Sequence, residues 1–145
     1  MAAKPVHSKK GVKEQQVPLF DRLPPVVLAW LIPGAGHYYL KLRVHAAVLL
    51  VTIVGMFLTG ILMQGRMFEP SNSDLFTTVM TYGGYVADLC TGLLYFLTVG
   101  LGYHQETLPG AVHDYGTKFI VCAGLLNILA MVDAYEIASG RKAAA

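Results

Sequence analysis

The sequence contains little charge. Only 14% of its 145 residues are Asp, Glu, Lys or Arg and 54% are hydrophobic, whereas roughly a quarter of the residues in a soluble globular domain are charged. The net charge is only +2, and the basic residues are not interleaved with aromatic residues, so no nucleic-acid partner is expected. The two cysteines, Cys90 and Cys122, lie in apolar stretches, where buried thiols are expected rather than a disulfide framework. The composition predicts one compact membrane domain.

Signatures of catalysis and of metal binding are also missing. The sequence has no Cys-x-x-Cys, no nucleophile elbow and no Ser/His/Asp arrangement with supporting spacing. Gly34-Ala-Gly36 is no dinucleotide-binding loop, because Tyr39 stands where the third glycine would be and no βαβ pattern surrounds it. The histidines form no i, i+4 pair of the kind found in helical metal sites. We therefore predict no catalytic residues, no metal site and no resident cofactor.

Long apolar runs dominate what the sequence does contain. The twenty residues from Val44 to Met63 have His45 as their only ionisable member, and this is the length that an α-helix needs to cross a bilayer core. Lipid offers backbone groups no hydrogen-bond partner, so such a run must be helical. Four hydrophobic segments can be drawn, namely Pro24–Leu40, Val44–Met63, Leu75–Tyr103 and Gly116–Ala138. The predicted fold is all-α, a polytopic membrane helical bundle with three to four transmembrane helices.

The first segment leaves two topologies open. Pro33, Gly34 and Gly36 interrupt it, since proline removes a helix hydrogen bond and glycine loosens the backbone. The segment either spans as a kinked helix or enters the membrane and returns. We favour a span, because Trp30 and the neighbouring tyrosine pair suit the interfacial belts of a membrane protein.

Basic residues predict the domain layout and the orientation. Residues 1–22 read as a basic solvated tail, residues 23–140 as the membrane helical domain and residues 141–145 as a short C-terminal tail. The N-terminal tail lacks the apolar region that a secretory signal places after its charges. Cytoplasmic flanks are enriched in Lys and Arg, and either topology of the first segment leaves most of these residues on the side of the N-terminus. The N-terminus is predicted to be cytoplasmic, and the side of the C-terminus stays open.

A family resemblance lies in the stretch from Leu28 to Leu50. An apolar segment runs into a Gly-x-Gly turn, then a histidine, an aromatic pair, a leucine and a basic residue, and this order resembles the signature of TM2-type small membrane proteins. The matching positions are Pro33, Gly34, Gly36, His37, Tyr38, Tyr39, Leu40 and Lys41. The end of the last segment, with Asp133, Tyr135 and Arg141, is similar to the family's last helix. The resemblance implies an uncharacterised bacterial branch in the inner (cytoplasmic) membrane, and it implies no biochemical activity.

Asp88 is the only charged residue of the third segment. An aspartate at the bilayer centre is costly unless it is paired or neutralised. If the Gly83-Gly84 pair divides an interfacial helix from a span over Tyr85–Tyr103, Asp88 lies in the first turn, where a carboxylate suits the helix N-terminus. A packing hydrogen bond and a proton or ion relay are the other interpretations, so Asp88 is a candidate ion or proton site.

Asp133 is the second candidate ion or proton site. It lies three residues before Glu136, so both carboxylates project from a similar face of the last helix. Acidic residues at a helix C-terminus oppose the dipole. We expect local pairing with Arg141 or Lys142, or solvation, rather than a metal site.

His45 is the residue we select if a pigment or haem is bound. Imidazole at a membrane boundary can ligate haem, a chlorophyll magnesium or zinc. Of the five histidines, His45 alone sits just inside a long apolar helix. A polar side chain at the interface is the simpler interpretation.

Small residues indicate close helix packing. Ala130, Ala134 and Ala138 repeat every four residues on the last helix, and Asn127 lies near the same stripe. Such stripes let helices approach closely while an asparagine bonds across. A shorter stripe, Gly55 and Thr59, lies on the second segment. Packing within the chain is favoured over a surface reserved for another protein.

Three functions fit these features. The first is a non-catalytic integral membrane protein that packs as an accessory or scaffold subunit in a larger complex, respiratory or photosynthetic for example, with the lipid bilayer and other membrane-protein subunits as partners. The alternative is a minimal transporter or channel component that uses Asp88, Asn127 and Asp133 as a polar path. The third is pigment or haem binding through His45.

Overall fold

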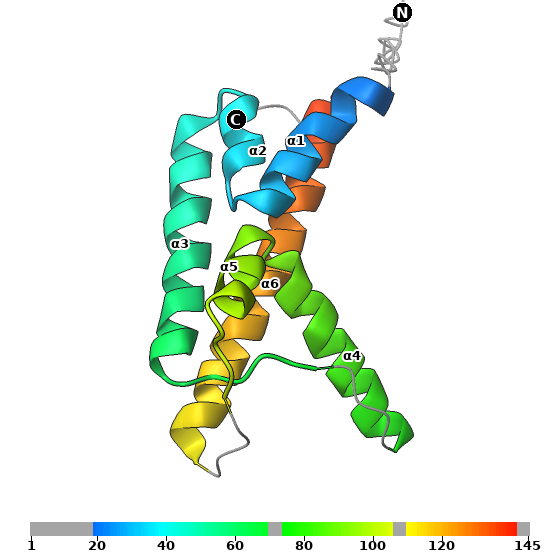
Figure 1. Cartoon of the computed structure of the whole chain (residues 1–145). Coiled ribbons are helices and arrows are strands. Elements are labelled where there is room, and N and C mark those ends of the chain that lie inside the picture. Colours follow the sequence, from blue (N-terminus) through cyan, green and yellow to red (C-terminus); the bar gives the residue numbers. More distant parts are fainter. Residues whose placement is uncertain (1–18, 70–73, 106–109, 142–145) are drawn as a thin grey trace, which may run out of the picture.

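Two long helices frame the protein. A computed structural model describes residues 19–69, 74–105 and 110–141 (Figure 1), and every regular element within these ranges is an α-helix. Helices α3 (Arg43–Leu62) and α6 (Ala111–Ala138) are long and apolar enough to cross a membrane. At about 1.5 Å per residue, each reaches the thickness of a hydrocarbon core, roughly 30 Å. The predicted all-α fold is confirmed, with two to three candidate membrane-spanning helices; the predicted count of three to four spans is not confirmed.

The first hydrophobic segment folds back on itself. Helix α1 (Leu19–Leu31) is followed by a turn at Pro33 and Gly34 and by the short helix α2 (Ala35–Tyr39), which runs back beside α1 (Figure 1). We call this pair the upper hairpin. With 13 residues, α1 extends only about 20 Å, too short to cross. The preference for a spanning first segment is therefore not supported, and re-entry stays the other prediction.

The third hydrophobic segment is broken as well. Helix α4 (Leu75–Cys90) and helix α5 (Leu93–Gly100) form a pair bent by 100°. In Figure 1, α4 rises to about half the height of α3 and α5 turns back toward the lower end. The pair is one broken span or a re-entrant loop, and we call it the lower hairpin. The break falls at Gly92, whose φ of +63° lies in the left-handed region that favours glycine.

The predicted division of this segment at Gly83 and Gly84 is wrong. Helix α4 passes through both glycines without interruption. No straight span over Tyr85–Tyr103 exists, because the chain bends at Gly92. Asp88 therefore lies in the last turn of α4 rather than in the first turn of a span, and it cannot cap a helix N-terminus.

Helix α6 is the central element. It packs against α1, α3 and α4, and its contact with α3 contains the buried core. The residues of this core are Ile53, Phe57, Ile120, Ala123 and Ala130. Gly124 of α6 lies so close to α4 that a Cβ atom would overlap the carbonyl oxygen of Ala87. The last turn of α4, just before the break between α4 and α5, thus packs directly against the middle of α6.

The lower half of α4 stands away from this body (Figure 1). Its apolar side chains Leu75, Phe76, Val79 and Met80 are exposed. A Cβ atom at Gly83 would meet nothing within 4 Å. We call Leu75–Gly83 the α4 arm.

Candidate functional site where the hairpins meet

The tips of both hairpins meet at Asn127 of α6. Its Nδ2 atom donates hydrogen bonds to the carbonyl oxygens of Cys90, at 2.7 Å, and Trp30, at 3.3 Å. These carbonyls lie at the ends of α4 and α1, and the last four carbonyls of a helix have no partner within it. Asn127 is fully buried, so its amide satisfies groups that lipid could not.

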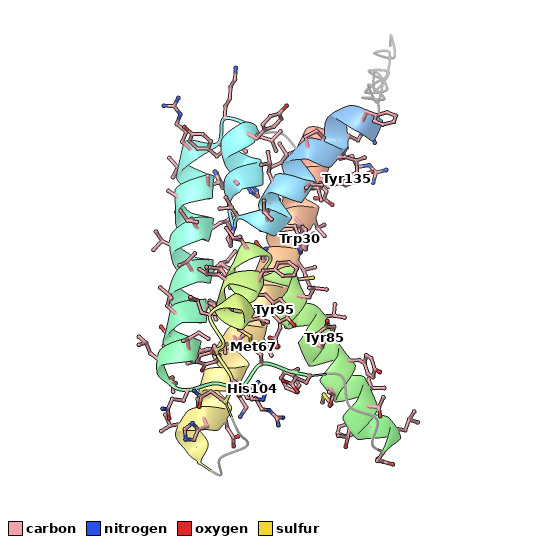
Figure 2. The ribbon with its side chains drawn as sticks, viewed as in Figure 1. Trp30, Met67, Tyr85, Tyr95, His104 and Tyr135 are labelled. Atoms are coloured by element: carbon pink, nitrogen blue, oxygen red, sulfur yellow. The ribbon has the colours of Figure 1, made fainter. Side chains whose placement is uncertain are left out.

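Trp30 and Gly92 complete this junction. The indole Nε1 of Trp30 donates a hydrogen bond of 3.2 Å to the carbonyl oxygen of Leu89. A Cβ atom at Gly92 would overlap the carbonyl oxygen of Trp30, so only glycine permits this approach. The Trp30 ring also meets Phe96 of α5 edge to face, with ring centroids 6.3 Å apart (Figure 2). The two hairpins are therefore joined tip to tip.

Asp88 is buried next to this junction. Its side chain is fully buried in the last turn of α4. Oδ2 accepts a hydrogen bond of 2.7 Å from the backbone N–H of Phe68, while the buried Oδ1 has no partner among the described residues. A half-satisfied carboxyl group in an apolar interior is costly. Such a group is more typical of a functional site than of a packing contact.

Asp88 ends a row of polar and small residues on α4. Thr77, Thr81, Gly84 and Asp88 are spaced by four, three and four residues, which places them on one helix face. Sequence reasoning missed Thr77 and Thr81, although this spacing in an apolar segment was a signal that could have found them. The row leads from the α4 arm to the buried break.

A cavity of about 730 Å³ opens beside this row, between α4, α5 and the segment 65–69. Its volume lies within the range of about 300–1,000 Å³ typical of ligand sites. Tyr95 of α5 lines it and meets Tyr85 of α4 edge to face, with ring centroids 6.3 Å apart (Figure 2). The polar lining comes from Arg66, Glu69, Thr77, Thr81, His104 and Gln105. The cavity can therefore hold water or a small polar ligand.

Tyr103 fixes the lower end of the cavity. Its hydroxyl donates a hydrogen bond of 2.8 Å to the carbonyl oxygen of Gly65, which ties the chain after α5 to the segment after α3. Burial raises the pKa of the Tyr103 hydroxyl, so the group remains a donor at neutral pH. The nearby pair of Glu69 and His104, at 3.4 Å, is exposed and contributes little.

Asp133 belongs to a different place in the fold. Its Oδ2 lies 2.9 Å from Nε2 of His37 in α2, and His37 is fully buried. This contact joins the two stretches that carry the TM2 resemblance. Sequence reasoning considered Arg141 and Lys142 as partners and missed His37; Lys142 lies outside the described residues. Asp133 and Asp88 are attached to different hairpins and are not brought together.

The remaining predicted residues take varied positions. Ala130 and Ala134 are buried and Ala138 is half-buried, whereas Gly55 and Thr59 are exposed on α3. Of the turn residues, Pro33, Gly34 and Gly36 are buried and Tyr38 and Tyr39 are exposed.

His45 is exposed on α3. Haem or pigment binding through His45 stays a prediction, to be checked by the visible absorbance of the purified protein and of His45→Ala. Among the described residues, no three His, Cys, Asp or Glu side chains lie close enough together to hold a metal ion.

These features define a small all-helical protein with two to three candidate membrane spans, as in an integral membrane protein. Residues 25–143 match DUF6677, a family of unknown function, and the chain belongs to this family. No curated protein and no solved structure matches the chain.

Proposed function

We propose that this protein is a non-catalytic integral membrane protein that moves a proton or small cation through Asp88. The observation that carries the proposal is the buried, half-satisfied carboxyl group of Asp88 on α4, the helix whose Thr77 and Thr81 line a polar cavity. An ionisable residue inside a membrane domain is by default a candidate for an ion or proton pathway.

The broken helices support the same function. In many transporters, discontinuous helices end near the bilayer midplane and form the binding site there. Here α1 and α4 both end about halfway along the molecule (Figure 1), where the carbonyl oxygens of Trp30 and Cys90 accept hydrogen bonds from Asn127. Non-helical backbone at such a depth is tolerated where it is buried in protein or lines a cavity.

The orientation that we propose puts the upper end of Figure 1 in the cytoplasm. The start of α1, the α2–α3 connection and the end of α6 lie toward that end (Figure 1), and these segments contain Arg22, Lys41, Arg43 and Arg141. The end of α3 and the start of α6 lie toward the other end, and the chain there contains Arg66 and Lys118. Four further lysines precede α1 in the sequence. Cytoplasmic flanks are enriched in Lys and Arg, so the N-terminus is cytoplasmic, in the inner membrane of a bacterium, and the cavity opens on the opposite side. The contact of His37 with Asp133 supports kinship with TM2-type proteins, which is part of this proposal.

The test is ion flux into proteoliposomes that contain the purified full-length chain. Asp88→Asn removes the ionisable group but keeps an oxygen that can accept the N–H of Phe68, so the fold should survive while flux is lost. Asp114→Asn is the matched control, because Asp114 is exposed in the first turn of α6. Unchanged flux in Asp88→Asn, or no flux in the unaltered protein, would remove the transport function.

A second function, an accessory subunit of a larger membrane complex, is favoured by the α4 arm. This arm exposes Leu75, Phe76, Val79 and Met80 and packs against little of its own chain. The occupant we propose is an apolar helix of another membrane subunit. Native electrophoresis and mass spectrometry of gently solubilised membranes test it.

A matched pair of substitutions sharpens this test. Val79→Trp on the arm should abolish co-migration with the complex, whereas Val51→Trp, on the equally exposed outer face of α3, should not. Migration of the unaltered chain alone as a small species would contradict the subunit function.

A further inference from the structure

We infer that the cavity between α4 and α5 gives water access to a single exchangeable proton on the carboxyl group of Asp88, with the Phe68 side chain as the barrier between cavity and carboxyl group. The inference rests on the proposed transport site and adds its ligand and its barrier.

The surroundings of Asp88 suit a proton better than a metal ion. Calcium takes six to eight oxygen ligands and magnesium is octahedral, whereas a proton needs one oxygen lone pair. Oδ2 already faces the N–H of Phe68 at 2.7 Å, and a donor at that position repels a cation. The Thr91 hydroxyl donates to the backbone oxygen of Asp88, at 2.6 Å. Oδ1 is thus the one buried oxygen of this side chain left to carry a proton.

Among the residues that the structure describes, no Lys, Arg or His side chain forms an ion pair with Asp88. Helix α6 presents Gly124 and Asn127 to this part of α4, and α1 presents Trp30. The ionisable neighbours are Tyr85 and Cys90 of α4 and Tyr95 of α5, with Arg66, Glu69 and His104 on the wall of the cavity. An ionised Asp88 would therefore lack a direct ion pair, which favours the protonated form in a low-dielectric interior.

Phe68 touches both the cavity and Asp88. Its side chain lines the cavity, and its ring lies where a Cβ atom of Gly84 would be, one turn before Asp88 on the same face of α4. The Arg66 guanidinium lies 5.8 Å from the ring centroid, a distance at which a cation is attracted to an aromatic face. The Phe68 ring therefore lies against α4 one turn from the carboxyl group, which is completely hidden from solvent.

Carbodiimide labelling of the full-length chain in detergent tests both parts. Dicyclohexylcarbodiimide enters apolar sites and reacts with protonated carboxyl groups, and peptide mass spectrometry locates the adduct. We expect an adduct on Asp88 that disappears as the pH is raised. No adduct at any pH, or protection by sodium or calcium ions at constant pH and ionic strength, would overturn the assignment of a proton.

A water-soluble carbodiimide tests the barrier. It must reach Asp88 through the cavity, so Phe68→Ala should raise the labelling rate several-fold and Phe68→Leu should raise it less. The matched control is Phe76→Ala, because Phe76 is exposed on the α4 arm, and its rate should equal that of the unaltered chain. Circular dichroism verifies that each variant is folded, and equal rates in folded Phe68→Leu and the unaltered chain would overturn the barrier.

The labelling result and the flux result are independent. Labelling that depends on pH and on Phe68, without proton flux in proteoliposomes, would leave the proton site in place and remove transport as the function. Flux lost in Asp88→Asn, with no pH-dependent labelling, would retain transport and overturn the proton site.

Discussion

The two hairpins share one plan but differ in their interiors. In each, a helix runs inward, the chain turns at a glycine with positive φ, and a shorter helix follows (Figure 1). In the upper hairpin α2 lies against α1, because Gly36 has no side chain where the carbonyl oxygen of Pro25 passes. In the lower hairpin α4 and α5 diverge by 100° beside a cavity of about 730 Å³. The helices of the upper hairpin are in close contact, whereas those of the lower hairpin border a cavity.

Two side chains of the segment after α3 lie where α4 and α5 diverge. The segment after α3 places Phe68 on Gly84 of α4 and places the sulfur of Met67 3.7 Å from the Thr98 hydroxyl of α5. Two large side chains therefore lie between α4 and α5. Both turns use a glycine with positive φ but with a different ψ, −13° at Gly34 and −123° at Gly92, so the difference between the hairpins comes from the turns as well as from what lies between their helices.

The largest expected effect comes from the joint that the hairpins share. Gly92→Ala should cost about 3 kcal/mol or more, because a positive-φ backbone conformation that favours glycine costs another residue roughly 1–3 kcal/mol, and a Cβ atom would also overlap the Trp30 carbonyl oxygen. Gly102→Ala is the matched control, since its φ of +72° is similar and its Cβ would meet nothing; it should cost only the strain. Thermal unfolding in detergent, followed by circular dichroism, measures both. Equal losses would show that contact between the tips is dispensable.

Asn127→Leu should loosen both hairpins together. It leaves the carbonyl oxygens of Trp30 and Cys90 without their donor, which should cost about 1–3 kcal/mol. Trp30→Phe removes one hydrogen bond, to Leu89, and should cost about 1 kcal/mol. Hydrogen exchange of residues 25–36 and 84–96 reports each hairpin separately. Faster exchange in only one of them would contradict a common anchor.

His37→Leu should affect the upper hairpin alone. It removes the contact with Asp133, whose side chain is 28% exposed, so solvent screening reduces the cost to about 1 kcal/mol. Asp133→Asn keeps an acceptor for Nε2 and should cost less. The test is hydrogen exchange together with water-soluble carbodiimide labelling of Asp88, which should not change. Faster labelling of Asp88 in His37→Leu would show that a change in the upper hairpin alters the lower one.

Tyr103→Phe should give the smallest effect, confined to the lower hairpin. It removes the hydrogen bond to Gly65 and should cost about 0.5–1.5 kcal/mol. Exchange should quicken in residues 93–103 and remain unchanged in residues 25–36. An equally large increase of hydrogen exchange in the upper hairpin would contradict the independence of the two hairpins.

The long helices could be predicted from the sequence, whereas the reversal after α1 was one of two alternatives and the reversal at Gly92 was missed. The apolar runs from Val44 to Met63 and from Gly116 to Ala138 correspond closely to α3 and to most of α6. The hydropathy of a segment predicts that it lies in apolar surroundings. It does not predict whether the chain crosses a membrane there or reverses its direction. The return at Gly92 depends on contact with Trp30, more than sixty residues earlier in the chain, so the neighbouring residues do not encode it alone.

Only part of the candidate site could likewise be predicted from the sequence. Asp88 and Asn127 stood out because polar residues are rare in apolar segments. Their partners did not, because the N–H of Phe68 and the carbonyls of Trp30 and Cys90 are backbone groups that every residue carries. The partner of Asp133 was missed for a related reason, since His37 is 96 residues away and no local spacing connects them.

The single amide at Asn127 also has a consequence for how the protein is assembled in the cell. Helices α3 and α6 can insert as complete spans, whereas α1 is too short to do so and the α4–α5 pair is bent. Before both hairpin tips reach it, the Nδ2 group of Asn127 lacks its two acceptors, a costly state for an amide in an apolar environment. The two hydrogen bonds form together only when α1 and α4 both end at α6, so Asn127 couples the placement of one hairpin to that of the other.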